Sequence, residues 1–402
     1  MKAKRQAENY TIATAFGPDG APARYDIDDA GRILSAGPWD GAAQQADRIV
    51  TPGMVDIQVN GFAGIDFNAT GVTPERMDEA LAGMLATGVT RCLPTLITAS
   101  QDDLVTLLGT LDNAVSRSNL GPFMVPGYHI EGPFMSPEEG YVGAHPAAHM
   151  RSGSPDLVAA LQRVTTRPIR LMTVAPEIDG VIDLITLLRA QNITCAIGHS
   201  AASRTEIDAA IAAGATMSTH LGNGMPHMLD KNESSLLVQL GRDRLMASFI
   251  ADGIHIPSDI LQSWLRAKTL DRAMIVTDAS AGAGAPAAQS QFTIGAQTIF
   301  RHKDGSVRLP GSSYLAGSAA SMDEMVRNVM RWYGFGMPEV IQLTRVNPLR
   351  AIGLPAENPR PGEPADFVEW DVGSGHPHVV KAAIGPWNVE PEQAPQVGLT
   401  MR

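Results

Sequence analysis

The sequence predicts an α/β protein: a (β/α)₈ TIM-type barrel accompanied by a small β-sandwich that both chain ends form together. Three observations support this prediction. The 402 residues leave room for a barrel of about 250 residues and an accessory domain. In the middle of the chain, short apolar runs rich in β-branched residues alternate with longer stretches of helical periodicity. Both ends show strand-like runs and turn residues without that periodicity.

The N-terminal part of the sandwich is expected within residues 10–39. Strand-like pieces there are separated by Gly-Pro-Asp-Gly at 17–20 and Asp-Asp-Ala-Gly at 28–31. Such clusters favour β-turns and interrupt helices. Residues 1–51 are therefore predicted as the N-terminal part of the sandwich.

The barrel is expected next, over residues 52–350. Parallel strands that are buried on both faces read as short apolar runs, and helices connect them. Helical candidates include 74–87, 178–191 and 204–213. The eight strand candidates are, in order, 54–59, 90–97, 124–130, 169–174, 194–197, 215–219, 245–251 and 273–276. Eight strands with intervening helices favour a closed barrel over an open sheet.

The pattern of short strands returns at the C-terminal end. Pro-Gly-Glu-Pro at 361–364 precedes the strand-like runs 365–371 and 379–385. Residues 351–402 are therefore predicted as the C-terminal part of the same sandwich.

The composition restricts the classes of function. The net charge of −11 repels nucleic acid and anionic lipid, and no local stripe of lysine and arginine offsets it. No apolar run approaches the roughly 18 residues that a membrane span needs. Cys92 and Cys195 lie inside apolar runs, where a free cysteine behaves as a small buried hydrophobe. We therefore expect a cytoplasmic protein that acts on a small molecule.

Polar residues follow several predicted strands at the end where barrel enzymes place their active sites. Glu131, His199 and His220 would converge from strands three, five and six as a site for a divalent metal with room for water. Alone, each has an ordinary structural interpretation, such as a capping histidine or a solvated loop acid. Their shared position favours function. The polar residues in such positions are Gln58, Asn60, Glu131, His199, His220, His255 and Asp278.

Eight short motifs occur in an order that is typical of a known family. They are PGMVD (52–56), LPTLIT (93–98), HIEGPF (129–134), GHS (198–200), THL (219–221), ADGIH (251–255), VTDA (276–279) and LAGS (315–318). On these motifs the chain resembles the N-acetylglucosamine-6-phosphate deacetylases of the amidohydrolase superfamily. The resemblance covers about residues 30–371.

This resemblance implies roles for the strand-end residues. Glu131, His199 and His220 would bind one divalent metal ion per chain, with zinc favoured and iron, cobalt or manganese as alternatives. Asp278 would be the general base and acid, which takes a proton from the attacking water and returns it to the departing amine.

The resemblance also implies substrate contacts. His145, in the insertion after strand three, would polarise the acetamide carbonyl and hold the sugar. His255 would contact the substrate, which it does in some family members from across a dimer interface. A homodimer is therefore expected.

The chain departs from the superfamily at strand one. Many amidohydrolases end this strand with His-x-His, which binds a second metal, whereas this chain has Gln58-Val59-Asn60. The period of two still directs Gln58 and Asn60 to one face. Because amides are poor ligands for zinc or iron, a single metal site is predicted.

A second departure follows strand six. The family usually reads His-Leu-aromatic-Asn-Ala-Met there and then supplies an arginine for the 6-phosphate, whereas residues 220–232 read HLGNGMPHMLDKN. We predict substrate contacts from Asn223, Gly224, His227 and Lys231. A lysine would hold a phosphate as a point charge, without the bidentate fork of arginine.

The predicted reaction is hydrolysis of N-acetylglucosamine 6-phosphate to glucosamine 6-phosphate and acetate. One alternative is deacetylation of a different or unphosphorylated N-acyl amino sugar. Another is a different amidohydrolase reaction, by a cyclic-amide hydrolase or a deaminase. Such enzymes normally need His-x-His and often a carboxylated lysine after strand four, and residues 169–176 contain no lysine. A non-catalytic barrel would have lost a metal or acid position, and none is lost.

Overall fold

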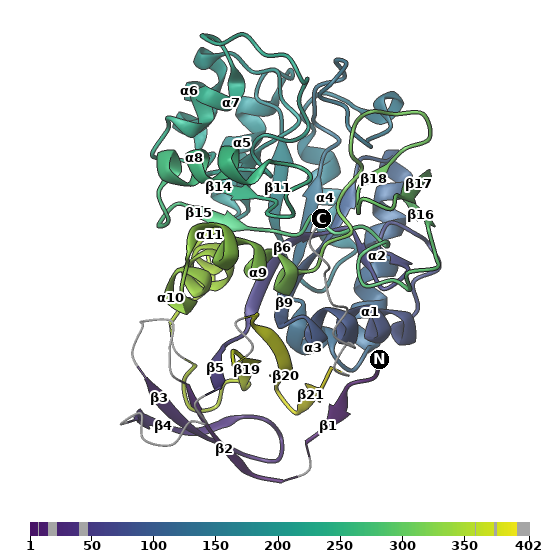
Figure 1. Ribbon diagram of the computed structural model, residues 1–402. Coiled ribbons are helices and arrows are strands. Elements are labelled where there is room, and N and C mark those ends of the chain that lie inside the picture. Colours follow the sequence, from purple (N-terminus) through teal and green to yellow (C-terminus); the bar gives the residue numbers. More distant parts are fainter. Residues whose placement is uncertain (7, 15–21, 40–46, 358, 374–375, 392–402) are drawn as a thin grey trace.

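The computed structural model describes residues 1–6, 8–14, 22–39, 47–357, 359–373 and 376–391. Its centre is a barrel of eight parallel strands, with the terminal sheets below it in Figure 1. The strands, in the order in which they pair, are β6 (Met54–Val59), β9 (Val89–Ile97), β10 (Tyr128–Glu131), β11 (Ile169–Val174), β12 (Thr194–Ile197), β13 (Met217–Ser218), β14 (Met246–Phe249) and β15 (Ala273–Ile275).

The barrel closes between its first and last strands. Val59, at the end of β6, forms a parallel bridge with Ala279, which follows β15. The amide of Asp278 donates to the carbonyl of Gln58 at 3.0 Å, and the amide of Asn60 donates to the carbonyl of Ala279 at 2.7 Å. The closure therefore brings the polar ends of strands one and eight together. The predicted fold class is confirmed.

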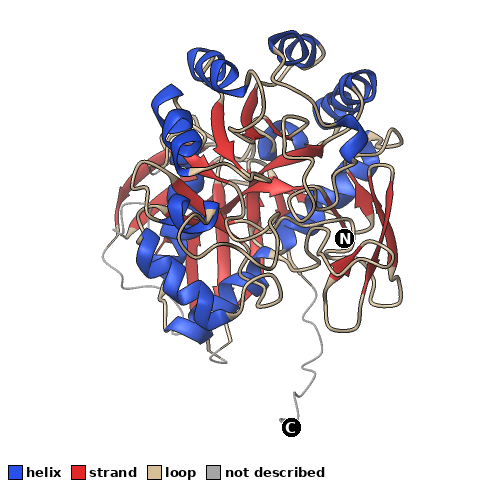
Figure 2. Ribbon diagram, turned by 90° about the horizontal axis from the view of Figure 1, so that it is seen from above, coloured by secondary structure: helices blue, strands red, loops and turns tan. Residues whose placement is uncertain are grey.

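Helices lie outside the strands (Figure 2). Several of them begin at a capping residue: Thr73 caps α1 by accepting from the amide of Arg76, and Ser203 and Glu206 form a capping box on α6. The longer helices are α1 (Pro74–Ala86), α2 (Gln101–Arg117), α4 (Pro155–Arg163), α5 (Val181–Ala190), α6 (Arg204–Ala213), α7 (Ser235–Leu240), α8 (Ser258–Lys268) and α9 (Met322–Tyr333). Shorter turns are α3 (Gly121–Met124), η1 (Ala147–His149), α10 (Met337–Ile341), η2 (Gln342–Val346) and α11 (Asn347–Ala351).

One strand prediction was wrong at its start. The run 124–130 is apolar, but Met124 closes the short helix α3 and β10 begins only at Tyr128. Pro122 favours the first turn of this helix, and Pro126 cannot donate to a strand ladder. Cys92 and Cys195 are free and buried, as predicted.

The chain ends form two packed sheets. One sheet orders β1 (Lys4–Arg5), β21 (Trp387–Val389), β20 (His378–Ile384), β19 (Asp366–Asp371) and β5 (Arg48–Pro52); the other contains β2 (Tyr10–Thr14), β3 (Ala23–Ile27) and β4 (Ile33–Pro38). Tyr25 and Phe367 join the sheets, with ring centroids 5.1 Å apart. The predicted turn at 28–31 is present, because the amide of Gly31 donates to the carbonyl of Asp28. The turn at 17–20 lies outside the described residues, and the bounds 1–51, 52–350 and 351–402 stay a prediction.

An insertion between β15 and α9 forms a further sheet. Its antiparallel strands are β16 (Gln291–Ile294), β17 (Gln297–Arg301) and β18 (Val307–Arg308). Asp66, in the small hairpin of β7 (Gly61–Phe62) and β8 (Ile65–Asp66), accepts from Thr293 Oγ1 and from the amide of Gly295, both at 2.9 Å. The insertion is therefore anchored to the C-terminal end of strand one. Among the described residues, no helix is long and apolar enough to span a membrane.

Candidate active site

Glu131, His199 and His220 meet at the C-terminal end of the barrel. Glu131 is the last residue of β10, and the histidines follow β12 and β13. Glu131 Oε1 lies 3.0 Å from His220 Nε2 and 3.5 Å from His199 Nε2. One ligand atom from each residue falls within 4.8 Å of the others, and all three are buried. The structure therefore brings the predicted metal ligands together.

The backbone at the site adopts a conformation that most residues avoid. His199, His220 and Asp278 have φ values of 50°, 25° and 47°, in the left-handed region. They make up half of the six described non-glycine residues with positive φ. Such conformations persist only where the surrounding structure enforces them, and they cluster at functional sites. The local geometry therefore supports a functional role for these three side chains.

Neighbouring groups orient His199. Its Nδ1 donates to the carbonyl of Tyr141 at 2.7 Å, so the proton is on Nδ1 and the lone pair of Nε2 faces Glu131. Glu177 holds the following turn by accepting from Ser200 Oγ at 2.8 Å and from the amide of Ala201 at 2.6 Å. The imidazole is thus presented as a ligand.

The donor set fits a divalent metal. Burial by itself would raise the pKa of Glu131, but the neighbouring imidazoles of His199 and His220 bring it well below its usual value. The site therefore holds one ionised carboxylate facing two imidazole nitrogens. One oxygen and two nitrogen ligands suit zinc and other divalent transition metals.

Asp278 lies beside this cluster and is held by the amides of strand one. Asn60 Nδ2 donates to Asp278 Oδ1 at 2.8 Å. Gln58 Nε2 donates to the same oxygen at 3.2 Å and to Glu131 Oε1 at 3.0 Å. Burial raises the pKa of Asp278 to about 6. His220 opposes this rise in pKa, and the negative charge of Glu131 adds to it. Gln58 and Asn60 therefore act as donors to carboxylates, in positions where His-x-His would hold a metal.

His145 approaches from the loop after β10. The amide of Thr98 donates to His145 Nδ1 at 3.3 Å, which places the proton on Nε2. That Nε2 lies 3.8 Å from Glu131 Oε2. Burial and the neighbouring His199 lower the pKa of His145 to about 3, so the ring is neutral. A neutral imidazole with an N–H in this place can donate to a carbonyl oxygen of a ligand.

Comparisons with known proteins identify the family. The model of the amidohydrolase family matches residues 49–397. N-acetylglucosamine-6-phosphate deacetylase of Homo sapiens is 33% identical over 81% of this chain and 80% of that protein. The chain belongs to the amidohydrolase family. N-acetylgalactosamine-6-phosphate deacetylase of Escherichia coli O157:H7 is 30% identical over 81% of this amidohydrolase and 84% of that enzyme.

A solved structure is similar over nearly the whole chain. N-acetyl-D-glucosamine-6-phosphate deacetylase from Mycobacterium smegmatis superposes with a TM-score of 0.81 and is 27% identical. The match covers 94% of this amidohydrolase and 99% of that chain. The family resemblance drawn from the eight motifs is confirmed.

The Glu131–His199–His220 cluster opens into a pocket of about 330 Å³, a size that suits a small ligand. Five of the six predicted substrate contacts line it, namely His145, Asn223, Gly224, His227 and His255. Asn60 and Asp278 line it as well. Gln58 contacts both carboxylates without lining the pocket. Lys231 is exposed and does not line the pocket.

Gly224 has a packing reason to be glycine. A Cβ there would lie 2.7 Å from the ring of His199, and φ is +59°. Gly222 similarly lies against the ring of Trp264, because a Cβ on Gly222 would stand 2.2 Å from that ring. Both glycines thus let the loop after β13 pass close to the buried ring of His199 and the half-buried ring of Trp264.

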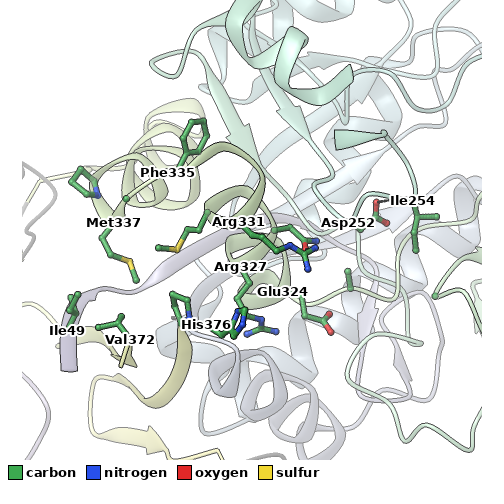
Figure 3. A pocket seen from close by; sticks show the side chains of 18 of the residues that line it. Ile49, Asp252, Ile254, Glu324, Arg327, Arg331, Phe335, Met337, Val372 and His376 are labelled. Atoms are coloured by element: carbon green, nitrogen blue, oxygen red, sulfur yellow. Dashed lines mark hydrogen bonds between the residues drawn. The ribbon is translucent and has the colours of Figure 1, made fainter. Parts of the chain in front are cut away.

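A larger cavity of about 1230 Å³ lies next to the segment that carries His255. Asp252, Ile254, Glu324, Arg327 and Arg331 line it, together with residues of the terminal sheets (Figure 3). Ile254 lines both cavities, and beside it Asp252 Oδ2 contacts His255 Nδ1 at 2.6 Å. The metal cluster opens into the smaller one.

Sequence reasoning missed the contribution of the insertion to the pocket. Ile294, Arg308, Ser313 and Tyr314 line it. A signal was present, since 291–300 reads QFTIGAQTIF, two alternating runs around a Gly-Ala turn that is typical of a hairpin. Nothing in that pattern indicated where the hairpin would pack.

Proposed function

We propose that this amidohydrolase removes the acetyl group from N-acetylglucosamine 6-phosphate, with acetate and glucosamine 6-phosphate as products. The observation that carries the proposal is the placement of a buried carboxylate, Asp278, and a neutral imidazole, His145, around the Glu131–His199–His220 cluster in one pocket. The relatives support the substrate class. A mutant of the Mycobacterium smegmatis enzyme was solved with N-acetyl-D-glucosamine 6-phosphate bound.

Glu131, His199 and His220 would hold one divalent ion, for which we favour zinc over iron, cobalt or manganese. When bound, such an ion supplies Lewis-acid chemistry, because it acidifies water and polarises a carbonyl oxygen. A second ion is not proposed. The strand-one amides direct their nitrogens, which are donors, toward Glu131 and Asp278.

Asp278 would transfer the proton. A carboxyl group with its pKa near 6 is ionised at neutral pH and can accept a proton from the water that attacks the acetamide carbon. When the C–N bond breaks, the same carboxyl group returns that proton to the sugar nitrogen. Asn60 and Gln58 keep its Oδ1 in place by donating to it.

His145 would act on the carbonyl oxygen. Its Nε2–H is directed toward the cluster, and the low pKa keeps the ring neutral, so it donates a hydrogen bond without giving up the proton. Negative charge develops on this oxygen as water attacks, and a fixed donor stabilises the transition state more than the ground state.

One relative acts on a different sugar by its name, N-acetylgalactosamine-6-phosphate deacetylase. The two sugars differ at the C4 hydroxyl, so both belong in the test. A homodimer and a cytoplasmic location also remain proposals.

The test measures acetate release by the purified, metal-loaded protein. The test compares four sugars: N-acetylglucosamine 6-phosphate, N-acetylgalactosamine 6-phosphate and their two unphosphorylated forms. A cyclic amide such as dihydroorotate tests the alternative amidohydrolase reaction. We expect the highest kcat/KM for N-acetylglucosamine 6-phosphate. Turnover of the cyclic amide without acetate release from any sugar would refute the proposal.

A further inference from the structure

The ring of His255 is held by a buried carboxylate. His255 Nδ1 lies 2.6 Å from Asp252 Oδ2, and the two side chains are each 4% exposed. His255 lines the smaller pocket, whereas Asp252 lines the larger cavity (Figure 3). One ring nitrogen is thus engaged by Asp252, and Nε2 is left as the ring nitrogen that can meet a ligand.

The chain segment around Asp252 fixes the position of its carboxylate. Asp252 follows β14, and its Oδ1 accepts from the amides of Ile254 and His255, both at 2.8 Å. In such an Asx turn, one oxygen of the side chain is used on the backbone. Helix α9 restrains the same segment, because Asn328 Nδ2 donates to the carbonyl of Ala251 at 3.0 Å. The second oxygen, Oδ2, therefore meets His255 in a fixed position.

The carboxyl group of Asp252 is ionised at neutral pH. Burial would raise its pKa, but His255 and the backbone amides of the turn bring this pKa below its ordinary value. An ionised carboxylate accepts hydrogen bonds and donates none. The proton between Asp252 and His255 is therefore on His255 Nδ1.

The histidines of the site differ in what holds Nδ1. The partner is a backbone carbonyl for His199, a backbone amide for His145 and a carboxylate for His255. A hydrogen bond to an ionised group is roughly twice as strong as one between neutral groups. Of these three rings, His255 therefore has the strongest orienting contact.

His255 also lies within electrostatic reach of the carboxyl group proposed to transfer the proton. Burial raises the pKa of Asp278, and both His220 and His255 oppose this rise. Asp278 and His255 line the same pocket. The orientation of His255 and the place of its proton would therefore affect a substrate that is bound beside Asp278.

We propose that Asp252 is a positioning residue, which fixes the ring of His255 with the proton on Nδ1 and so presents Nε2 to the amino sugar. The assignment rests on the proposed function for the identity of the substrate. Asp252 lies outside the lining of the smaller pocket, so it acts through His255. The role belongs to Oδ2, because Oδ1 is used on the turn.

Asp252→Asn isolates this role. The amide oxygen can still accept from the backbone of the turn, but the nitrogen in place of Oδ2 is a donor and would move the proton of His255 to Nε2. Asp230→Asn is the matched control. Asp230 Oδ1 also accepts from the amides two and three residues ahead, in an exposed turn (230–233) that contains no histidine.

The kinetic test is a double-mutant cycle on N-acetylglucosamine 6-phosphate. For Asp252→Asn we expect kcat/KM to fall about ten- to a hundredfold, as for other carboxylates that orient a functional histidine. Added to His255→Gln, the same substitution should change kcat/KM by less than about twofold, because the ring through which Asp252 acts is gone. Asp230→Asn should match the wild type.

A spectroscopic test does not depend on turnover. Nuclear magnetic resonance of zinc-loaded protein with isotope-labelled histidine reports which ring nitrogen carries the proton, and the His255 signals are assigned by their loss in His255→Gln. We expect the proton on Nδ1 in the wild type and on Nε2 in Asp252→Asn. If the wild type deacetylates neither the phosphorylated nor the unphosphorylated sugar, the proposed function fails by itself, and these spectra still test the pairing.

Two outcomes would overturn the proposal. One is a further large loss of kcat/KM when Asp252→Asn is added to His255→Gln, which would mean that Asp252 acts on the fold. The other is an unchanged proton position on His255 in Asp252→Asn. Asp252→Ser is a second variant, because its hydroxyl can accept from the turn but lacks Oδ2. It should reproduce the loss if Asp252→Asn does not fold, and a wild-type kcat/KM in Asp252→Ser would refute the role.

Discussion

Two buried polar clusters lie at opposite ends of the barrel strands, and they differ in how fully their carboxylates are paired. At the N-terminal end, Asp366 opens β19 and contacts two arginines: Arg345 Nη1 at 2.9 Å and Arg91 Nη2 at 3.2 Å. Its other oxygen accepts from Thr90 Oγ1 at 2.5 Å. Arg345 also donates to the carbonyl of Gly53 at 2.6 Å, just before β6.

At the C-terminal end, the carboxylates have imidazoles and amides as neighbours instead. Glu131 and Asp278 lie among three histidines, and no arginine or lysine donates to either within the described residues. In the same described part, Gln58 Oε1, Asn60 Oδ1 and His220 Nδ1 are buried without a hydrogen-bond partner, whereas the Asp366 cluster has one such atom, Arg345 Nε. A buried polar group without a partner costs stability. We infer from this contrast that the Asp366 cluster serves folding, whereas the Glu131 cluster is completed by groups that bind to it.

The largest expected effect comes from removing a metal ligand. His199→Ala should lose the bound ion and essentially all turnover, because it leaves only two of the three proposed protein ligands to hold the ion. Gln58→Ala is the matched control and should retain the ion, since its amide donates to carboxylates. Elemental analysis of both variants and the wild type decides this. Two ions per wild-type chain would contradict the single site.

Asp278→Asn should lower kcat by about 10²- to 10⁴-fold, because it removes the group proposed to transfer the proton. The substitution keeps the shape of the side chain, so the metal content should equal that of the wild type. Rates of acetate release are measured at saturating substrate with metal content verified. A near-normal rate would mean that another group transfers the proton.

Asp366→Asn should lower the free energy of unfolding by about 3–5 kcal/mol, because it leaves Arg345 buried without its counter-charge. The kcat of the folded fraction should stay within about twofold of the wild type, since the cluster lies away from the pocket. Thermal and urea unfolding test the stability. Asp208→Asn, which breaks an exposed pair with Arg242, is the control and should change the stability little.

The smallest effect is the pH dependence of that stability difference. Burial would raise the pKa of Asp366, but Arg345 and Arg91 bring it below its ordinary value. A depressed pKa stabilises the fold above the pKa of the unfolded chain, about 3.9, and this contribution is lost as the pH falls through the folded-state value. The gap between wild type and Asp366→Asn should therefore be constant from pH 7 to about 5 and shrink below about 4. A gap that widens in acid would reverse the assigned sign.

Much of this fold follows from local patterns. The runs at 54–59, 169–174 and 194–197 are strands with the predicted bounds, and 204–213 is the predicted helix, because burial on both faces and capping residues act over a few neighbours. The run 124–130 misled because apolar residues suit a short buried helix as well as a strand. The Glu131–His199–His220 cluster was also predictable from a general rule. The parallel strands of a barrel all end at the same rim, so residues at the strand ends lie close together.

The sequence by itself determined the strand order, the helices and the convergence of Glu131, His199, His220 and Asp278, since each depends on local periodicity or on the geometry common to all barrels. Only the tertiary structure decided the proton position on His145, the donor role of Gln58, and the places of Lys231 and Arg308 relative to the pocket. These depend on which loops pack against each other across long sequence separations. No period or spacing encodes such packing, because it is the sum of many weak contacts made after the barrel has closed.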